Sequence, residues 1–148
     1  MVDNSSGGPN ERGVHILDST LESVDAAVGI VMAAAGEMGF DEDARFQIDL
    51  AVRESMVNAV VHGNCYSENK KVRLSVRKEP DRLTVTVADQ GKGFDIDSVP
   101  DPLTKDHLLN QSGRGILLIR SFMDEFETRR LEPNGTEFKL VKYLNQTR

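Results

Sequence analysis

Residues 41–64 read DEDARFQIDLAVRESMVNAVVHGN and are predicted to form one long helix. Acidic residues open this stretch and His-Gly-Asn closes it, and both are typical signals for the two ends of a helix. With about 100° between successive residues, the apolar side chains form two stripes: Phe46, Leu50, Val57 and Val61 on one side, and Ile48, Val52 and Ala59 on the other. A helix that is apolar on two sides is expected to be mostly buried.

Two polar residues of this helix, Glu54 and Asn58, lie four positions apart and therefore on the same face. Asp49 and Arg53 can pair with each other at the same spacing, but no cation lies three or four positions from Glu54. One interpretation is the solvated edge of an ordinary amphipathic helix, since polar side chains usually face water. The other is the wall of a site, in which Asn58 supplies an oxygen to a metal ion and Glu54 acts as a base.

The length and charge of the chain limit the classes of protein to which it can belong. At 148 residues, it is long enough for one domain with a substantial core. Its net charge of −6, its pI near 5.1 and its aromatic content of 5% argue against direct binding to nucleic acid, which normally requires a basic surface. No apolar run approaches the roughly 20 residues of a membrane span, so we expect no membrane segment.

The cysteine content and the N-terminal sequence indicate the cellular compartment and the bounds of the domain. Cys65 is the single cysteine, which excludes an internal disulfide and a multi-cysteine metal site and fits a cytoplasmic protein. Residues 1–13 are rich in Gly, Ser and Asn and contain no apolar segment, so they are predicted to be a disordered tail and not a secretion signal. We therefore expect a single domain over residues 14–148.

Changes in the period of the apolar residues predict the other elements. We expect a strand at 14–17, a helix at 21–38, strands at 72–76 and 83–87, a helix at 116–123, and strands at 126–131 and 136–144. Residues 95–112 show no sustained period, and so long a connection in a compact domain is expected to be a lid or a binding loop. The predicted fold is an α+β two-layer sandwich, in which a mixed, mostly antiparallel sheet of about four or five strands is covered on one face by three helices.

Glycines occur at two places where the chain is expected to approach a ligand. Gly91 and Gly93 follow the end of an apolar strand, and Gly113 and Gly115 precede a helix, whose N-terminus can bind an anion. Asp89 stands at the end of the same strand, where its carboxylate can accept a hydrogen bond from an exocyclic amine. Each motif taken singly has an ordinary explanation, because glycine and Asp-x-Gly are common in turns.

Taken together, the motifs resemble one nucleotide-binding fold. E-x-x-x-N at 54–58, D-x-G-x-G at 89–93, G-x-G at 113–115 and Gly-Thr at 135–136 follow the order of the Bergerat (GHKL) ATP-binding fold. Gyrase-type ATPases, the chaperone of ninety kilodaltons, histidine kinases and mismatch-repair ATPases share this fold. The segments ESMVNAVVHGN, ADQGKGFD, SGRGILLIRSFMDEFE and NGTEF are similar to the anti-sigma-factor serine kinases of bacteria, and the resemblance extends over about residues 14–144.

The resemblance implies roles for four side chains. Asn58 would coordinate the Mg²⁺ that bridges the nucleotide phosphates. Glu54 would act as the general base toward an incoming hydroxyl group. Asp89 would accept a hydrogen bond from the adenine amine, and Thr136 would lie near the adenine.

The resemblance also implies roles for the glycine-rich segments. Gly91 and Gly93 would let the chain pass close to the base, and the backbone of Gly113, Arg114 and Gly115 would bind the phosphates at a helix start. Two interpretations stay open for the side chain of Arg114, which either adds a cation to the phosphates or points outward and pairs with acidic residues of the lid.

The resemblance implies the function of an ATP-dependent protein serine/threonine kinase that acts as an anti-sigma factor. It would transfer the γ-phosphate to a serine of an antagonist protein, hold a sigma factor in its alternate state, and form a homodimer. The alternative is an ATP-binding partner-switching module without phosphotransfer. A detached histidine-kinase catalytic domain is a third hypothesis, which is disfavoured because no segment resembles a helical hairpin with a phospho-accepting histidine.

Overall fold

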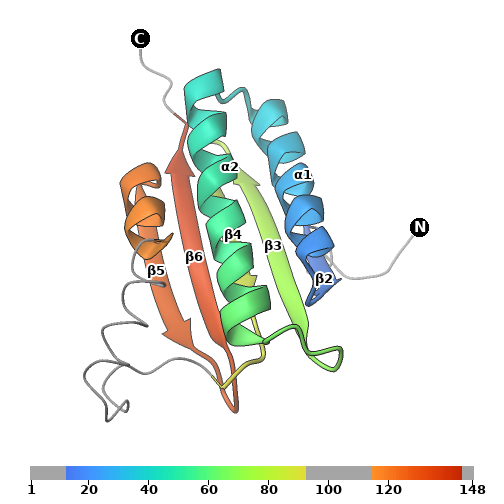
Figure 1. The fold of residues 1–148 in the computed structure, drawn as a ribbon. Coiled ribbons are helices and arrows are strands. Elements are labelled where there is room, and N and C mark those ends of the chain that lie inside the picture. Colours follow the sequence, from blue (N-terminus) through green and yellow to red (C-terminus); the bar gives the residue numbers. More distant parts are fainter. Residues whose placement is uncertain (1–12, 93–114, 145–148) are drawn as a thin grey trace.

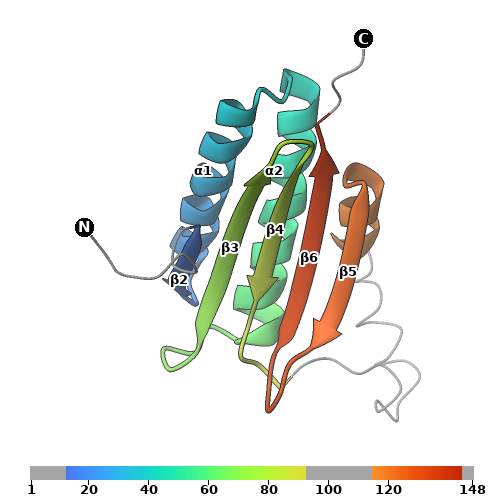
Figure 2. The ribbon, with the colours of Figure 1, turned by 180° about the vertical axis from the view of Figure 1, so that it is seen from behind.

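The computed structural model describes residues 13–92 and 115–144. Within these residues, one five-stranded sheet carries helices on one face (Figure 1), and the view from behind shows that no helix covers the opposite face (Figure 2). This arrangement confirms the predicted α+β sandwich of two layers. Except for Gly13, the predicted tail at 1–13 and the predicted lid at 95–112 lie outside the described residues.

The strands are β2 (Val14–Asp18), β3 (Lys71–Glu79), β4 (Arg82–Ala88), β5 (Glu125–Arg130) and β6 (Thr136–Tyr143). They lie in the order β2-β3-β4-β6-β5, and all four pairings are antiparallel, so the described sheet contains no parallel pair. Every strand expected from the alternation of apolar residues is confirmed, with β2 at an edge of the sheet. Strands β4 and β6 are neighbours in the sheet although they are far apart in the chain, so the residue after β4, Asp89, lies beside Thr136 at the start of β6.

The helices are α1 (Leu21–Met38), α2 (Glu42–Val57) and a segment at 115–122, which lies over β5 in both views (Figures 1 and 2). Side chains cap the first two: Thr20 Oγ1 accepts from the Ser23 backbone N at 3.2 Å, and an Asp41 carboxylate oxygen accepts from the Ala44 backbone N at 2.8 Å. Gly39 ends α1 at φ 90°, a left-handed conformation that glycine adopts without strain. None of the described helices is long and apolar enough to span a membrane.

The hydrophobic core lies between the helices and the sheet. Its fully buried members include Ile48, Val52 and Met56 of α2 and Val72, Leu74, Leu83, Val85 and Leu140 of the strands. The predicted burial of both apolar stripes of α2 is wrong for Phe46, which is 61% exposed. Phe46 stays outside the core between the helices and the sheet, and its ring meets that of Phe122 with 6.5 Å between ring centroids.

The end of the long helix departs from α-helical geometry. Asn58–Gly63 form a π-helix, η2, and the Asn64 backbone N donates to the carbonyl of Ala59, five residues earlier, at 2.8 Å. The sequence predicts one uninterrupted helix here, because a single wider turn leaves no signal in the period of the apolar residues. Short π-helical turns are frequent at functional sites, and this one begins at Asn58, a predicted site residue.

Candidate functional site

A cavity of about 380 Å³ opens where β4 ends and α2 passes into η2. Its floor follows the register of the sheet, which places Val87 of β4 beside Phe138 of β6, and Phe138 beside Thr128 of β5. Thr136 and Arg130 form the next row toward the end of the sheet. The helical wall consists of Ser55, Asn58, Ala59, His62 and Gly63. The cavity is thus built from segments far apart in the chain.

The structure brings three of the predicted site residues to this cavity: Asn58, Asp89 and Thr136 all line it. Glu54 and Gly115 lie next to Asn58. Gly91 does not line the cavity but packs against the backbone of Gly63, so in this structure it serves the contact between β4 and η2. The remaining predicted residues (Gly93, Gly113 and Arg114) lie outside the described residues.

Asp89 is the buried carboxylate of the cavity, with only 7% of its surface exposed. Its Oδ1 accepts from the backbone N of Gly91 at 2.9 Å and of Thr136 at 3.2 Å. Burial raises the pKa of the Asp89 carboxyl, and these two donors counteract only part of that effect. Within residues 13–92 and 115–144, no donor reaches Oδ2, so this oxygen is available to an N–H group of a ligand.

Three glycines allow close packing around Asp89, and two of them, Gly63 and Gly135, come from segments distant in the chain. A Cβ atom on Gly63 would lie 2.3 Å from Asp89 Oδ2, and a Cβ on Gly135 would lie 2.3 Å from the Asp89 carbonyl oxygen. A Cβ on Gly91 would lie 1.9 Å from the carbonyl oxygen of Gly63. No larger residue fits at these positions without movement, because side chains in proteins do not approach other atoms so closely. Gly63 and Gly135 therefore let two distant segments approach Asp89, and Gly91 lets the turn after β4 pack against Gly63.

Glu54 and Asn58 form a second polar group at the helical wall. The Asn58 Nδ2 donates to the backbone carbonyl of Glu54 at 2.8 Å, which orients the amide. A Cβ on Gly115 would lie 2.6 Å from Glu54 Oε1 and 3.4 Å from Asn58 Nδ2. The first described residue of the helix at 115–122 therefore lies directly against this pair. Asn58 lines the cavity and Glu54 does not, so the structure places one of the two side chains at the cavity wall.

The donor set restricts how a metal ion could be held here. The described residues contain no group of three or more His, Cys, Asp or Glu side chains arranged to hold a metal. A cation at Asn58 would therefore take one amide oxygen from this wall and most of its other ligands from a bound molecule or water. Mg²⁺ is commonly bound in this way, through few protein ligands together with phosphates and waters, so the residues fit this ion.

Several residues of the site are not predicted from the sequence. The sequence indicates Gly63 only as the end of the helix. No sequence pattern marks Ser55 as a site residue; its Oγ donates to the Ala51 carbonyl at 2.8 Å. Arg130 lines the cavity from β5, and its Nη2 donates to the Lys92 carbonyl at 3.3 Å. Side chains two positions apart in a strand lie on the same face, so the alternation of β5 places Arg130 beside Thr128, and this is the sequence signal that could have indicated Arg130.

Comparison with known proteins agrees with this geometry. The profile of a family described as "Histidine kinase-like ATPase domain" matches residues 17–142. The chain belongs to this family. The match spans α1, α2, η2 and nearly the whole sheet, and membership implies that the chain uses ATP. The resemblance carried by the four sequence motifs is thereby confirmed.

The proteins similar to this chain include bacterial proteins named serine-protein kinase and anti-sigma factor. The serine-protein kinase RsbW of Bacillus velezensis is 36% identical over 133 residues, which are 82% of this chain and 81% of that protein. The RsbW of Bacillus subtilis is 35% identical over 133 residues. The anti-sigma F factor of Oceanobacillus iheyensis is 31% identical over 108 residues, which are 72% of this chain and 74% of that protein.

The glycine contacts predict opposite effects of two Gly→Ala substitutions. Gly91→Ala should lower the free energy of unfolding by about 1–3 kcal/mol, because the new methyl group meets backbone that cannot rotate away. Gly29→Ala in the middle of α1 is the control: a Cβ there would have no atom within 4 Å, and alanine should raise stability by about 0.5–1 kcal/mol. Urea denaturation measures both, and an equal effect of the two substitutions would contradict the packing described.

Asp89→Asn should raise the free energy of unfolding of the ligand-free protein at pH 7. The folded-state pKa of Asp89 is raised, so ionisation of this carboxyl destabilises the fold at neutral pH and protonation removes that cost as the pH falls. Asparagine keeps an oxygen for Gly91 and Thr136 without the charge. The advantage of the variant should therefore shrink between pH 7 and about pH 3 in denaturation series, and a variant less stable than wild type at pH 7 would contradict the assignment.

Proposed function

We propose that this protein is an ATP-dependent protein serine/threonine kinase that acts as an anti-sigma factor. The proposal rests above all on the carboxylate of Asp89, buried at the end of β4 with one oxygen bonded to backbone and the other available to a ligand. The names of the similar proteins, serine-protein kinase RsbW and anti-sigma F factor, support the class of activity.

In this proposal, the Asp89 end of the cavity binds adenine. Asp89 Oδ2 accepts a hydrogen bond from the exocyclic amine. Thr136 lies beside the base, because its N–H donates to Asp89 Oδ1 and its carbonyl accepts from the Asp89 N–H. The row formed by Val87, Phe138 and Thr128 provides the surface on which a planar ring can rest. Gly93 lies outside the described residues, and its predicted role, to let the chain pass close to the base, remains part of the proposal.

The Asn58 end of the cavity is proposed to bind the phosphates. Asn58 would hold Mg²⁺, which neutralises phosphate charge when it is bound. Gly115 is the first described residue of the helix at 115–122 and lies against Glu54 and Asn58, a position that suits a backbone donor to a phosphate. Gly113 and Arg114 precede it, and their predicted contacts with the phosphates remain part of the proposal.

Glu54 is proposed as the general base. It would accept the proton of a serine hydroxyl while the serine oxygen bonds to the γ-phosphorus and the bond to the β-phosphate oxygen breaks, so that ADP leaves. Within the described residues, Glu54 forms no ion pair with a cation, so its carboxylate is available to a substrate. The neighbouring Arg53 is occupied by Asp25 at 2.9 Å and by Asp49 at 3.4 Å.

The partners follow from the same proposal. The kinase would phosphorylate a serine of an antagonist protein and would bind a sigma factor in its alternate state, as a homodimer in the cytoplasm. The names of the relatives support the two kinds of partner. The single cysteine supports the cytoplasmic setting. The alternative, a partner-switching module that binds ATP without transferring phosphate, shares the Asp89 site and differs only in the role of Glu54.

Binding of Mg-ATP tests the nucleotide site. Calorimetry should show binding by the wild-type protein, and Asp89→Asn should weaken it by at least about tenfold, because an amide can present N–H to the adenine amine in place of an acceptor. Asn58→Ala should weaken binding only when magnesium is present. A wild-type protein that binds no ATP at any accessible concentration would overturn the proposal.

Glu54→Gln separates the kinase from the binding module. The substitution should reduce transfer of labelled phosphate to a serine-bearing partner by at least about a hundredfold, the range of general base catalysis, and should leave Mg-ATP binding nearly unchanged. Glu42→Gln is the matched control, because Glu42 is an exposed residue in the first turn of the same helix. The binding module predicts no phosphotransfer by the wild-type protein, and retained transfer by Glu54→Gln would exclude Glu54 as the base.

A further inference from the structure

Asn64 is a buried side chain that does not line the cavity. It is 1% exposed and lies directly after η2. Its Nδ2 donates to the Ser19 Oγ at 2.9 Å and to the Lys71 carbonyl at 3.0 Å, and its Oδ1 accepts from the Gln90 backbone N at 2.8 Å. One amide thus joins the end of the long helix to the β2–α1 connection, to β3 and to the residue two positions after β4.

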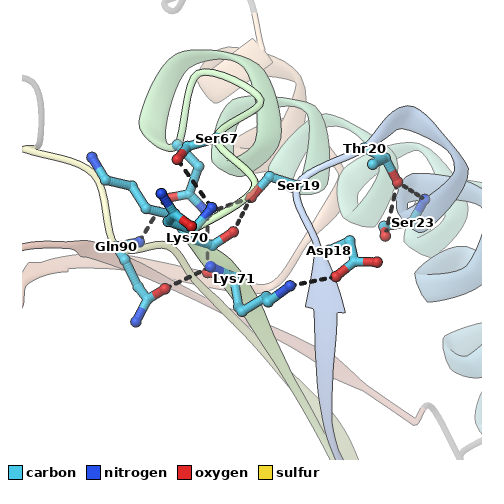
Figure 3. Close-up of polar contacts among 10 residues, drawn as sticks. Asp18, Ser19, Thr20, Ser23, Ser67, Lys70, Lys71 and Gln90 are labelled. Carbon is cyan, nitrogen blue, oxygen red and sulfur yellow. Dashed lines mark hydrogen bonds and ion pairs between the residues drawn. The ribbon is translucent and has the colours of Figure 1, made fainter.

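Further hydrogen bonds hold the same partners (Figure 3). Ser19 Oγ donates to the Lys70 carbonyl at 2.6 Å, and the Lys71 backbone N donates to the Gln90 Oε1 at 2.5 Å. Gln90 is therefore fixed twice, through its backbone by Asn64 and through its side chain by Lys71. These contacts run from the buried Asn64–Ser19 bond out to the exposed side chain of Gln90, and together they restrain the backbone around Gln90.

Gln90 stands between the two residues that define the carboxylate site. Asp89 precedes it, and the backbone N of Gly91, which follows it, donates to Asp89 Oδ1 at 2.9 Å. A rotation of the peptide at Gln90 would move this donor and with it the carboxylate. The Gln90 N–H has Asn64 as its acceptor, so this bond is the one that restrains the Asp89–Gln90 peptide from the side of the long helix.

We propose that Asn64 is a positioning residue that sets the base specificity of the nucleotide site. Its bond to Gln90 holds the turn at 89–91, and the turn presents Asp89 Oδ2 to the exocyclic amine of the base. An amide suits this place because it carries a donor and an acceptor on one planar group. The inference rests on the proposed binding of adenine at Asp89.

Amide hydrogen exchange in the nucleotide-free protein tests the first step. Asn64→Ala should speed exchange at Gln90 and also at Gly91 by at least about tenfold, since one lost hydrogen bond corresponds to roughly that factor. Ser19→Ala is the matched control: it removes another buried contact of Asn64 and leaves the bond to Gln90 in place. Unchanged exchange at Gly91 in Asn64→Ala would overturn the proposal, because Asn64 would then not organise the Asp89 turn.

The ratio of the dissociation constants of inosine triphosphate and ATP tests the second step. Inosine carries an oxygen in place of the amine, so the wild-type protein should prefer ATP. Asn64→Ala should reduce that preference about tenfold, and Ser19→Ala should change it by less than about twofold. Equal weakening of both nucleotides by Asn64→Ala would show a merely structural role and would overturn the proposal.

Asn64→Asp covers the case in which Asn64→Ala does not fold. It keeps an oxygen for the Gln90 N–H and loses the donors to Ser19 and Lys71, so the preference for ATP should persist despite lower stability, and its loss would contradict the proposal. A wild-type protein that binds ATP and inosine triphosphate equally contradicts the role of Asp89 and hence the claim on specificity. In that case the exchange experiment still decides whether Asn64 holds the turn, which separates the two failures.

Discussion

The structure depends on the burial of one carboxylate at the end of β4. Removing the charge of Asp89 from water is unfavourable, and the fold compensates it in part with two backbone N–H groups, one from Gly91 and one from Thr136. These donors come from different segments, so the β5–β6 turn has to meet the end of β4 at a definite distance. The glycines at 63, 91 and 135 make that approach possible.

The long helix links the two ends of the cavity. Its α-helical part carries Glu54 and ends beside Asn58, where Gly115 packs, and its π-helical turn carries Gly63 to the carboxylate of Asp89. A change of helical pitch between the two ends alters the direction of the backbone without a break in the chain. The segment that binds the phosphates in our proposal is therefore continuous with the one that packs on the adenine site, which is the arrangement expected where one ligand spans both.

Sequence and structure agree where a feature depends on residues close together in the chain, and they differ where it depends on distant ones. Apolar alternation located the strands, and the helical period of the apolar residues located α1, because those signals depend on neighbours in the chain. Burial of Phe46 was predicted wrongly because period alone does not tell how many sides of a helix are covered. The role of Asn64 was missed for a similar reason, since its bond to Gln90 joins residues 26 positions apart.

The sequence by itself determined the two-layer fold, its element order and the class of site, since apolar period and the order of the glycine motifs are properties of the chain. Only the tertiary structure decided which of these residues meet. It placed Gly91 against Gly63 and not in the cavity, and it introduced the π-helical turn at Asn58. The physical reason is that these features arise from contacts between separate segments, such as the bond from Thr136 to Asp89 across 47 positions, and a local pattern carries no record of them.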